Sequence, residues 1–336
     1  MYTYFLGLDV GKDTLDVALL SADHRLLDQQ QLANDPATIR RWVKSLPRLA
    51  PGFAPATCLA CLEHTGLYNR PLLTALQALA VPVWVERAAH LKACLGLVRG
   101  KTNKRDAERI ARYAARYRDQ AKRWQPARPV RAALDRLLAR RARLVKVIRL
   151  LQTPLSSSQG FFSAAEQRAE ERGCAASLAA LRANVLAADQ ALKALLRDDP
   201  ALAHLYQRLT SVPGIGLVTA AELLVTTNEF TASTDPKRYA CYAGVVPFEH
   251  SSGQRRGRPR VSHQANKRVK MLLHLAALAA VRHCPALKTY YERKVAEGKN
   301  KNKMLVRNNV RNKLVHYCFA CVQKDRQYDK NGGGLI

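Results

Sequence analysis

The chain has 336 residues, of which 48% are hydrophobic, so it is long enough and apolar enough for two or three domains with cores of their own. Lys and Arg number 55 against 26 Asp and Glu, and the formal net charge of +29 favours nucleic acid over an acidic small molecule as the partner. No apolar run has the length of a membrane-spanning helix and the amino terminus lacks the basic region of a signal peptide, so a cytoplasmic protein without a membrane partner is predicted.

The first third of the chain alternates between short strands and helices. Its β-prone or strongly apolar segments, each bounded by turn residues, are 4–10, 14–20, 25–32, 56–63 and 81–86. The first three predict an antiparallel meander, and amphipathic helices are expected after the later strands. Three consecutive strands followed by alternating helix and strand predict a mixed α/β domain over residues 1–126.

Beyond residue 127 the pattern becomes helical. Apolar residues recur at spacings of three and four from about 128 to 200, which predicts a helical hairpin or coiled coil at 127–203. Its first helix is rich in arginine, and a solvated dimerisation arm and direct phosphate contact both remain open. A mainly helical domain is expected at 204–330 and a loose tail at 331–336.

Carboxylates stand at the ends of predicted elements in the first domain. Asp9 and Glu63 each end an apolar strand, and Asp106 lies near the start of a helix with Asn103 one turn before it. An acid such as Asp9 can simply cap a turn, but oxygens that converge above one sheet suit a hard divalent ion. We expect Asp9, Glu63 and Asp106 to hold Mg²⁺, with Mn²⁺ as a substitute, and rank Asp13, Asp16 and Glu86 lower.

Two C-x-x-C pairs, at Cys58/Cys61 and Cys318/Cys321, could together form a four-thiolate zinc site. Both pairs lie inside apolar segments, where free cysteine commonly packs as a small hydrophobic residue. We therefore expect core cysteines and no zinc.

Two segments of the last domain have the composition of phosphate-binding sites. Pro213-Gly214-Ile215-Gly216 joins two predicted helices in the manner of a helix-hairpin-helix, whose backbone N–H groups can hold a phosphate, although any glycine-rich helix connection looks similar. Downstream, Ser251-Ser252-Gly253 precedes a run of arginines. A serine beside glycine can reach a phosphate closely, so nucleophilic catalysis and plain anion binding are both open.

The order and spacing of GLDVGK, LEHTG, GK-x-N-K-x-DA-x-RIA-x-YA, VPGIG and YAGVVP-x4-SG resemble the insertion-sequence transposases that have a DEDD, RuvC-like domain and a serine-bearing domain. That group includes the pilin-gene invertases. The resemblance covers nearly the whole chain. It implies an RNase H-like first domain and a bacterial, nucleoid-associated enzyme.

The resemblance also implies an activity and partners. Family members use a structured bridge RNA to pair with donor and target DNA, and are thought to act as dimers that join into tetramers. By position, Asp9, Glu63 and Asp106 match three of the four acidic ligands, and Ser252 matches the nucleophile, with Ser251 as its competitor. The third acid of the pattern is Asn103 here, which predicts weaker ion binding.

The chain is accordingly predicted to be an RNA-guided DNA recombinase that works through a phosphoserine intermediate with Mg²⁺. The residues expected to contact nucleic acid are Gly214, Gly216, Arg255, Arg256, Arg258, Lys267 and Arg268. One alternative is a hydrolytic RuvC-like junction nuclease, in which Ser252 only binds phosphate. A second is a non-catalytic nucleic-acid scaffold, whose binding would be indifferent to Mg²⁺.

Overall fold

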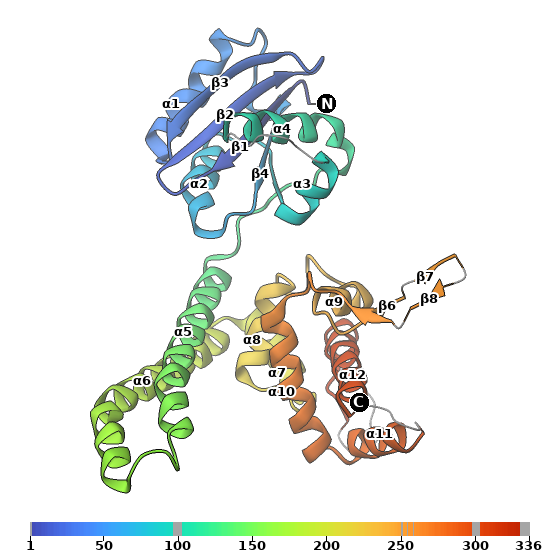
Figure 1. Ribbon diagram of the computed structural model, residues 1–336. Coiled ribbons are helices and arrows are strands. Elements are labelled where there is room, and N and C mark those ends of the chain that lie inside the picture. The colour runs from blue at the N-terminus through green and yellow to red at the C-terminus, as the bar shows by residue number, and fades with distance from the viewer. Residues whose placement is uncertain are drawn as a thin grey trace. The chain divides into compact units, whose positions relative to one another are not determined.

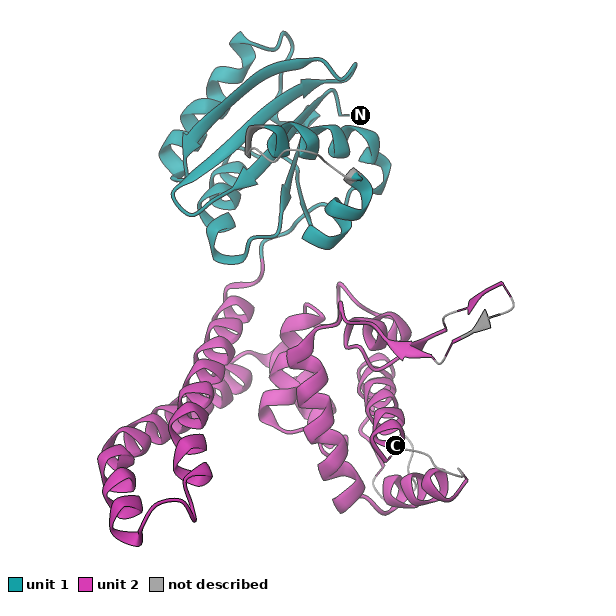
Figure 2. Cartoon of the chain, viewed as in Figure 1, with its two compact units in different colours: residues 1–126 teal, residues 127–336 magenta. Residues whose placement is uncertain are grey.

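The computed structural model describes residues 2–96, 103–249, 251–253, 255–257, 259–297 and 303–329. The chain divides into two compact units, residues 1–126 and 127–336 (Figure 2). The predicted boundary at 203/204 runs inside the second unit, because the long helices share one apolar core with the helices that follow them.

Unit 1 is a five-stranded sheet with helices on both faces (Figure 1). The strands, in the order β3-β2-β1-β4-β5 across the sheet, are β3 (Leu26–Ala33), β2 (Thr14–Ser21), β1 (Tyr4–Val10), β4 (Cys58–Glu63) and β5 (Val83–Glu86). The helices are α1 (Pro36–Ser45), α2 (Arg70–Ala78), α3 (Ala88–Leu95) and α4 (Asn103–Arg116). The first three strands are antiparallel neighbours, whereas β4 and β5 run parallel to β1. This is the predicted RNase H-like arrangement.

The two faces of the sheet carry alternate residues of each strand, as pleated strands require. Leu6, Leu8 and Val10 belong to the core that includes residues of α1 and α2. Phe5 belongs to the other core, which includes Ala107 and Ala111 of α4. Gly7 shares this second face. A Cβ at Gly7 would lie 2.0 Å from the Ala107 carbonyl oxygen, so α4 rests directly on β1.

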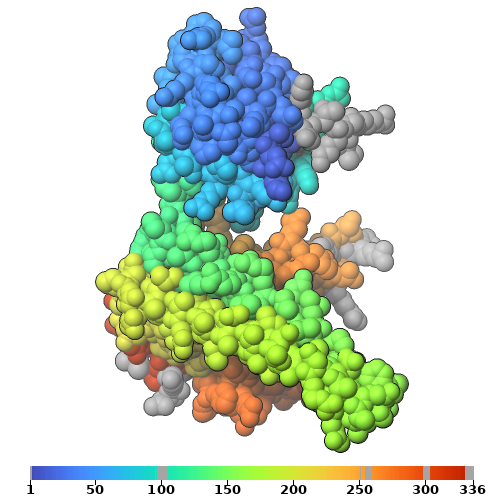
Figure 3. All heavy atoms as spheres, turned by 90° about the vertical axis from the view of Figure 1, so that its left-hand side faces the viewer, coloured from blue at the N-terminus to red at the C-terminus, as the bar shows by residue number. Residues whose placement is uncertain are grey.

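The described part of unit 2 consists of helices and four very short strands joined by loops. Its helices are α5 (Pro129–Ser157), α6 (Ala164–Asp198), α7 (Pro200–Ser211), α8 (Leu217–Thr226), α9 (Pro236–Tyr242), α10 (Lys267–His283), α11 (Pro285–Ala296) and α12 (Lys303–Gln323). Within this unit the far end of the α5–α6 hairpin, green to yellow-green, extends away from the other helices (Figure 3). Leu134 and Leu192, near its base, are fully buried, whereas Leu150 and Leu186, farther along it, are exposed.

The remaining strands form an arm between α9 and α10. Strand β6 (Pro247–Phe248) pairs with β9 (Arg260–Val261), and β7 (Ser251–Ser252) pairs with β8 (Arg255–Arg256). Figure 1 shows this arm projecting from the helices of unit 2. Among the described helices, none is both long and apolar enough to span a membrane.

Candidate active site and nucleic-acid interface

Four carboxylates form a row across unit 1. Asp9 stands opposite Asp16 in the β1–β2 register, and Glu63 stands opposite Glu86 in the β4–β5 register. In the parallel β1–β4 pair Leu8 stands opposite Leu62, so Asp9 and Glu63 come next along the two strands. Adjacent strands lie about 4.8 Å apart, so the backbones of neighbours in this row are separated by roughly that distance.

The row faces α4. Asp9 lies two residues after Gly7 and therefore shares its face of the sheet. Asp106 is in the first turn of α4, directly before Ala107, the residue that contacts Gly7. The Asp106 side chain is 23% exposed and is 3.3 Å from Nη1 of Arg109. The fold therefore brings Asp9, Glu63 and Asp106 to one side of one sheet.

Asp16 and Glu86, which rank lower as ligands on sequence grounds, belong to the same row. Asp16 is only 3% exposed and accepts a hydrogen bond of 3.2 Å from Nε2 of Gln31. Glu86 is 3.2 Å from Nδ1 of His90 and accepts a hydrogen bond of 3.3 Å from the Tyr113 hydroxyl. Burial, and then the charge of Glu86, raise the pKa of Tyr113 well above its ordinary value. The phenol therefore stays protonated and remains a donor to Glu86.

Hydrogen bonds from the loop that follows β4 hold the end of this strand. The side-chain amide of Asn69, a residue only 1% exposed, donates a hydrogen bond of 3.0 Å to the Glu63 carbonyl oxygen. The Thr65 hydroxyl in turn donates to the Asn69 amide oxygen. These bonds hold the backbone at Glu63, whereas the neighbouring His64 is exposed.

The donor set of this face suits a hard divalent ion, since its side chains offer carboxylate oxygens. Like charges directly opposite one another in a sheet are destabilising, and a cation between them removes that penalty. Within the described ranges no three His, Cys, Asp or Glu side chains are close enough together to hold a metal ion as they stand. The Asn103 side chain, the fourth predicted ligand, is outside the described residues.

The serines lie near the tip of the arm. Ser251 and Ser252 are both exposed, and Ser252 stands opposite Arg255 in the β7–β8 pair, with Gly253 following at a φ of +55°. The backbone of Arg255 and Arg256 is described but their side chains are not, and Arg258 lies outside the described residues altogether. The arm thus presents two hydroxyls next to a strand whose sequence is basic.

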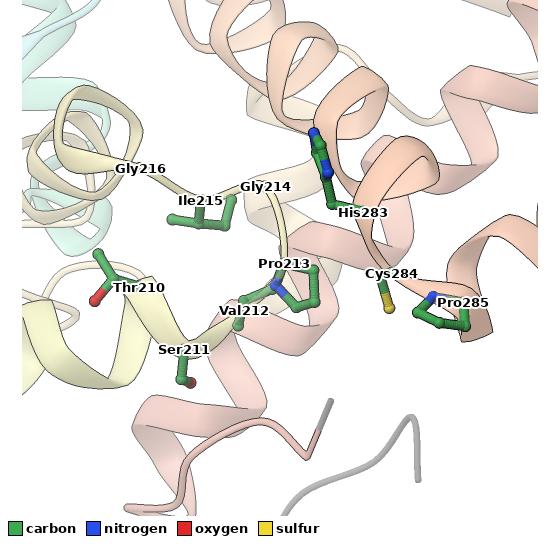
Figure 4. Close-up of a pocket in the computed structure, with 10 residues that line it drawn as sticks. All are labelled: Thr210, Ser211, Val212, Pro213, Gly214, Ile215, Gly216, His283, Cys284 and Pro285. Carbon is green, nitrogen blue, oxygen red and sulfur yellow. The ribbon is translucent and has the colours of Figure 1, made fainter. Parts of the chain in front are cut away.

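The glycine turn between α7 and α8 lines a surface pocket of about 380 Å³ (Figure 4). Gly214 has a φ of +83°, and a Cβ there would lie 2.2 Å from the Ala276 carbonyl oxygen of α10, so packing already requires glycine at this position. Gly216 is the N-cap residue of α8, makes no side-chain cap and has open space where a Cβ would be. Its phosphate contact stays a prediction.

Several basic residues have partners inside the protein. Arg268 is 2.9 Å from the carboxylate of Glu222, and burial is the main reason that the Glu222 pKa is raised, although Arg268 opposes the shift. In the α5–α6 hairpin, Arg141 pairs with Asp189 at 2.5 Å. Lys267, at the start of α10, is exposed. In the arginine-rich helix α5, Arg141 therefore contributes to an ion pair within unit 2.

The four C-x-x-C cysteines are buried and free. Burial is the largest cause that raises the pKa of the Cys58, Cys61 and Cys318 thiols, which keeps them neutral. They pack among apolar residues of the three cores, as predicted.

Two family models match this chain. A DEDD transposase model of IS110 elements matches residues 6–157, and a model described as Transposase IS116/IS110/IS902 family matches residues 206–292. A pilin gene-inverting protein of Moraxella bovis is 25% identical over 97% of this chain and 98% of its own length. An insertion element IS110 uncharacterized 43.6 kDa protein of Streptomyces coelicolor is 36% identical, over 46% of this chain and 37% of its own length.

Among solved structures, RuvC of Thermus thermophilus in complex with a Holliday junction substrate is 18% identical. It aligns over 37% of this chain and all of its own, with a TM-score of 0.28. The fold and the matched models together define a transposase whose amino-terminal domain is RuvC-like. The chain belongs to the IS116/IS110/IS902 family of transposases.

Proposed function

We propose that this transposase cuts and rejoins DNA through a covalent bond to Ser252, assisted by a divalent ion. One observation carries the proposal. The chain presents a row of carboxylates on the α4 face of one unit and an exposed pair of serines on a basic arm of the other. A nucleophile and a metal-binding set are the two components that phosphoryl transfer requires.

In this proposal Asp9, Glu63 and Asp106 hold Mg²⁺ or Mn²⁺, with Asn103 as a neutral oxygen ligand. Such an ion lowers the barrier by neutralising charge on the phosphate oxygens. The Ser252 hydroxyl oxygen forms a bond to phosphorus while its proton leaves. The 3′ oxygen of the cut strand departs as the hydroxyl, and the 5′ phosphate stays on the serine.

Rejoining reverses this step with a different strand. A 3′ hydroxyl attacks the phosphoserine, the bond between phosphorus and the serine oxygen breaks, and the serine recovers its proton. The ester retains the energy of the broken bond, so no ATP is consumed. The serine can come from any copy of the chain, in keeping with a dimer or tetramer.

We further propose that a structured bridge RNA selects donor and target DNA. Guide pairing delegates sequence reading to nucleotides and leaves the protein to contact backbones. The exposed Lys267, the arginines of the arm and the turn at Gly214 and Gly216 are the proposed backbone contacts. An excess of cations over acids supports such contacts.

The test is capture of the covalent intermediate. Protein, candidate RNA and DNA labelled at the 3′ end of the cut strand are incubated with Mg²⁺ and then separated under denaturing conditions. A labelled band at the mass of the protein is expected for the native chain and for Ser251→Ala, and not for Ser252→Ala. An adduct that survives Ser252→Ala and disappears with Ser251→Ala would move the nucleophile by one residue.

A second candidate is a hydrolytic nuclease, and the acid row favours it, because carboxylates that bind two ions can activate water without any serine. This alternative predicts free cut ends, no adduct, and cleavage that survives Ser252→Ala but is lost in Asp9→Asn. The same gel therefore separates the two reactions. Binding without cleavage, unchanged by Mg²⁺, would instead indicate a scaffold.

A further inference from the structure

Helix α12 buries an arginine whose charge is not balanced. Arg311 is only 6% exposed. Its Nη2 lies 2.6 Å from Nδ1 of His274 and 3.2 Å from the sulfur of Met304, and its Nη1 donates a weak bond of 3.4 Å to Asn308. The Nε–H is buried and has no hydrogen-bond partner among the described residues. All of the contacts of this guanidinium are with neutral groups.

The surroundings of Arg311 add positive charge. Lys270 and His274 on α10 and Arg307 on α12 are half-buried. Burial first, and then the neighbouring arginines, lower the pKa of Lys270, of His274 and of Arg311 itself. Because Nδ1 of His274 faces an obligatory donor, this imidazole is a neutral acceptor.

Among the described residues no carboxylate forms an ion pair with this cationic cluster, which consists of Lys270, Arg307 and Arg311 together with the neutral His274. Its lysine and arginines form no ion pair with described residues. The residues outside the described ranges contain no Asp or Glu, so none of their side chains can supply a missing acid. A buried charge without a counter-charge is strongly unfavourable, and an anionic ligand would balance it.

The cluster supports the base of the serine arm. The buried Asn308, which accepts from Arg311, donates a hydrogen bond of 2.6 Å to the Val245 carbonyl oxygen, two residues before β6 begins. A Cβ at Gly244 would lie 3.6 Å from Cδ of Lys270. Helices α10 and α12 therefore hold the cationic cluster against the segment that leads into the arm.

We infer that the cationic cluster binds a backbone phosphate of nucleic acid at the base of the serine arm. A phosphate presents several acceptor oxygens, and the guanidinium of Arg311 and the ammonium of Lys270 are donors for them. This inference rests on the proposed function for the presence of nucleic acid. It adds a second point at which a strand that reaches the arm is held.

The test compares Arg311→Met and Lys270→Met with Arg282→Met, a change at an exposed residue of the same α10. Thermal unfolding is followed with and without inorganic phosphate, at ionic strength held constant with NaCl. Phosphate is expected to raise the melting temperature of the native chain and of Arg282→Met, because a ligand of the folded state stabilises it. Both cluster variants should lose this rise and melt no lower than the native chain in phosphate-free buffer.

Binding of duplex DNA and of single-stranded RNA then identifies the source of the phosphate. The logarithm of the binding constant falls as the logarithm of the salt concentration rises. Loss of one phosphate contact makes this slope less steep by about 0.9 for duplex DNA and by about 0.7 for a single strand. The nucleic acid whose slope falls in both cluster variants is the ligand. If Arg311→Met does not fold, Lys270→Met carries the same expectation.

The inference is overturned if both cluster variants keep the phosphate-dependent rise and the native slopes. It is also overturned if the native chain shows no such rise. Failure of the proposed function has a different signature, namely no adduct from the native chain or an adduct insensitive to Ser252→Ala, whatever the slopes show. A covalent adduct from the native chain, together with unchanged salt slopes in both cluster variants, would contradict only the phosphate site.

Discussion

At the scale of single residues, Asp16 in the acid row provides a test of the proposed metal site. Its carboxylate is buried opposite Asp9, so Asp16→Asn removes a like-charge contact while keeping an acceptor for Gln31. We expect the variant to be more stable than the native chain in EDTA, by about 0.2–1 kcal/mol, and to gain less from added Mg²⁺. Thermal unfolding with EDTA and with Mg²⁺ measures both effects.

The matched control for that experiment is Asp13→Asn, a change at an exposed acid in the turn between β1 and β2. It should leave both melting temperatures where they are. A lower melting temperature of Asp16→Asn in EDTA would show that the buried carboxylate stabilises unit 1 without any ion, against the proposed role of the row.

Glu222 provides a pH-dependent prediction. Its pKa is raised in the folded chain, so the free energy that favours folding is fully present below about pH 4.5 and is lost as pH rises through the raised pKa. Glu222→Gln stays neutral, and its stability relative to the native chain should increase from pH 4 to pH 7. Urea unfolding at both pH values tests this. A relative decrease would show that the ion pair with Arg268 outweighs burial.

At the scale of elements, the contact of α4 with β1 depends on Gly7. A Cβ at this position meets backbone atoms, which cannot rotate away as a flexible side chain could. Gly7→Ala is therefore expected to push α4 from the sheet and to lower the free energy of unfolding by about 1–3 kcal/mol. Because Asp106 lies on the same turn of α4 as the contact, metal-dependent cleavage should fall as well.

The control is the same substitution at Gly173, which lies inside α6 with nothing within 4 Å of a Cβ. Alanine has the higher helix propensity, so Gly173→Ala should raise the free energy of unfolding by about 0.5–1 kcal/mol. Urea unfolding of both variants measures the two opposite signs. Equal effects of the two substitutions would contradict the close approach of α4.

At the scale of the whole molecule, alternation and spacing predicted most elements and the order of the first unit. They could not predict which acids share a row, because the partners of Asp9 and Glu63 depend on strand register, which no single segment specifies. Sequence alone therefore ranks Asp16 and Glu86 lower, although the register places them in the same row. The burial of Arg311 cannot be predicted for another reason, since α12 is buried on several sides and its sequence shows no clean polar face.

The hairpin also shows how local pattern and tertiary structure diverge. The apolar spacing predicted two packed helices, and α5 and α6 are both present. Two helices alone cannot enclose an apolar seam, so residues of their far half, such as Leu144 and Ile148, are only half-buried. Near the base Leu138 and Leu196 join the core of unit 2, whereas Leu178 is the buried leucine of the far half of α6.

The exposed apolar residues of the hairpin lead to a prediction about assembly. Leu150 is 62% and Phe161 86% exposed, and Val147, Phe162 and Leu186 are exposed as well. Apolar side chains concentrated on one element mark an interaction surface, and a second copy of the same hairpin offers a matching one.

We expect the native chain to be a dimer or larger by light scattering, and Leu150→Glu to shift the mass toward the monomer. Its melting temperature extrapolated to low protein concentration should not change, because the side chain is exposed within one chain. Leu49→Glu, at an exposed leucine of unit 1, should leave the mass unchanged. A native monomer, or a loss of mass in Leu49→Glu alone, would place self-association elsewhere than the hairpin.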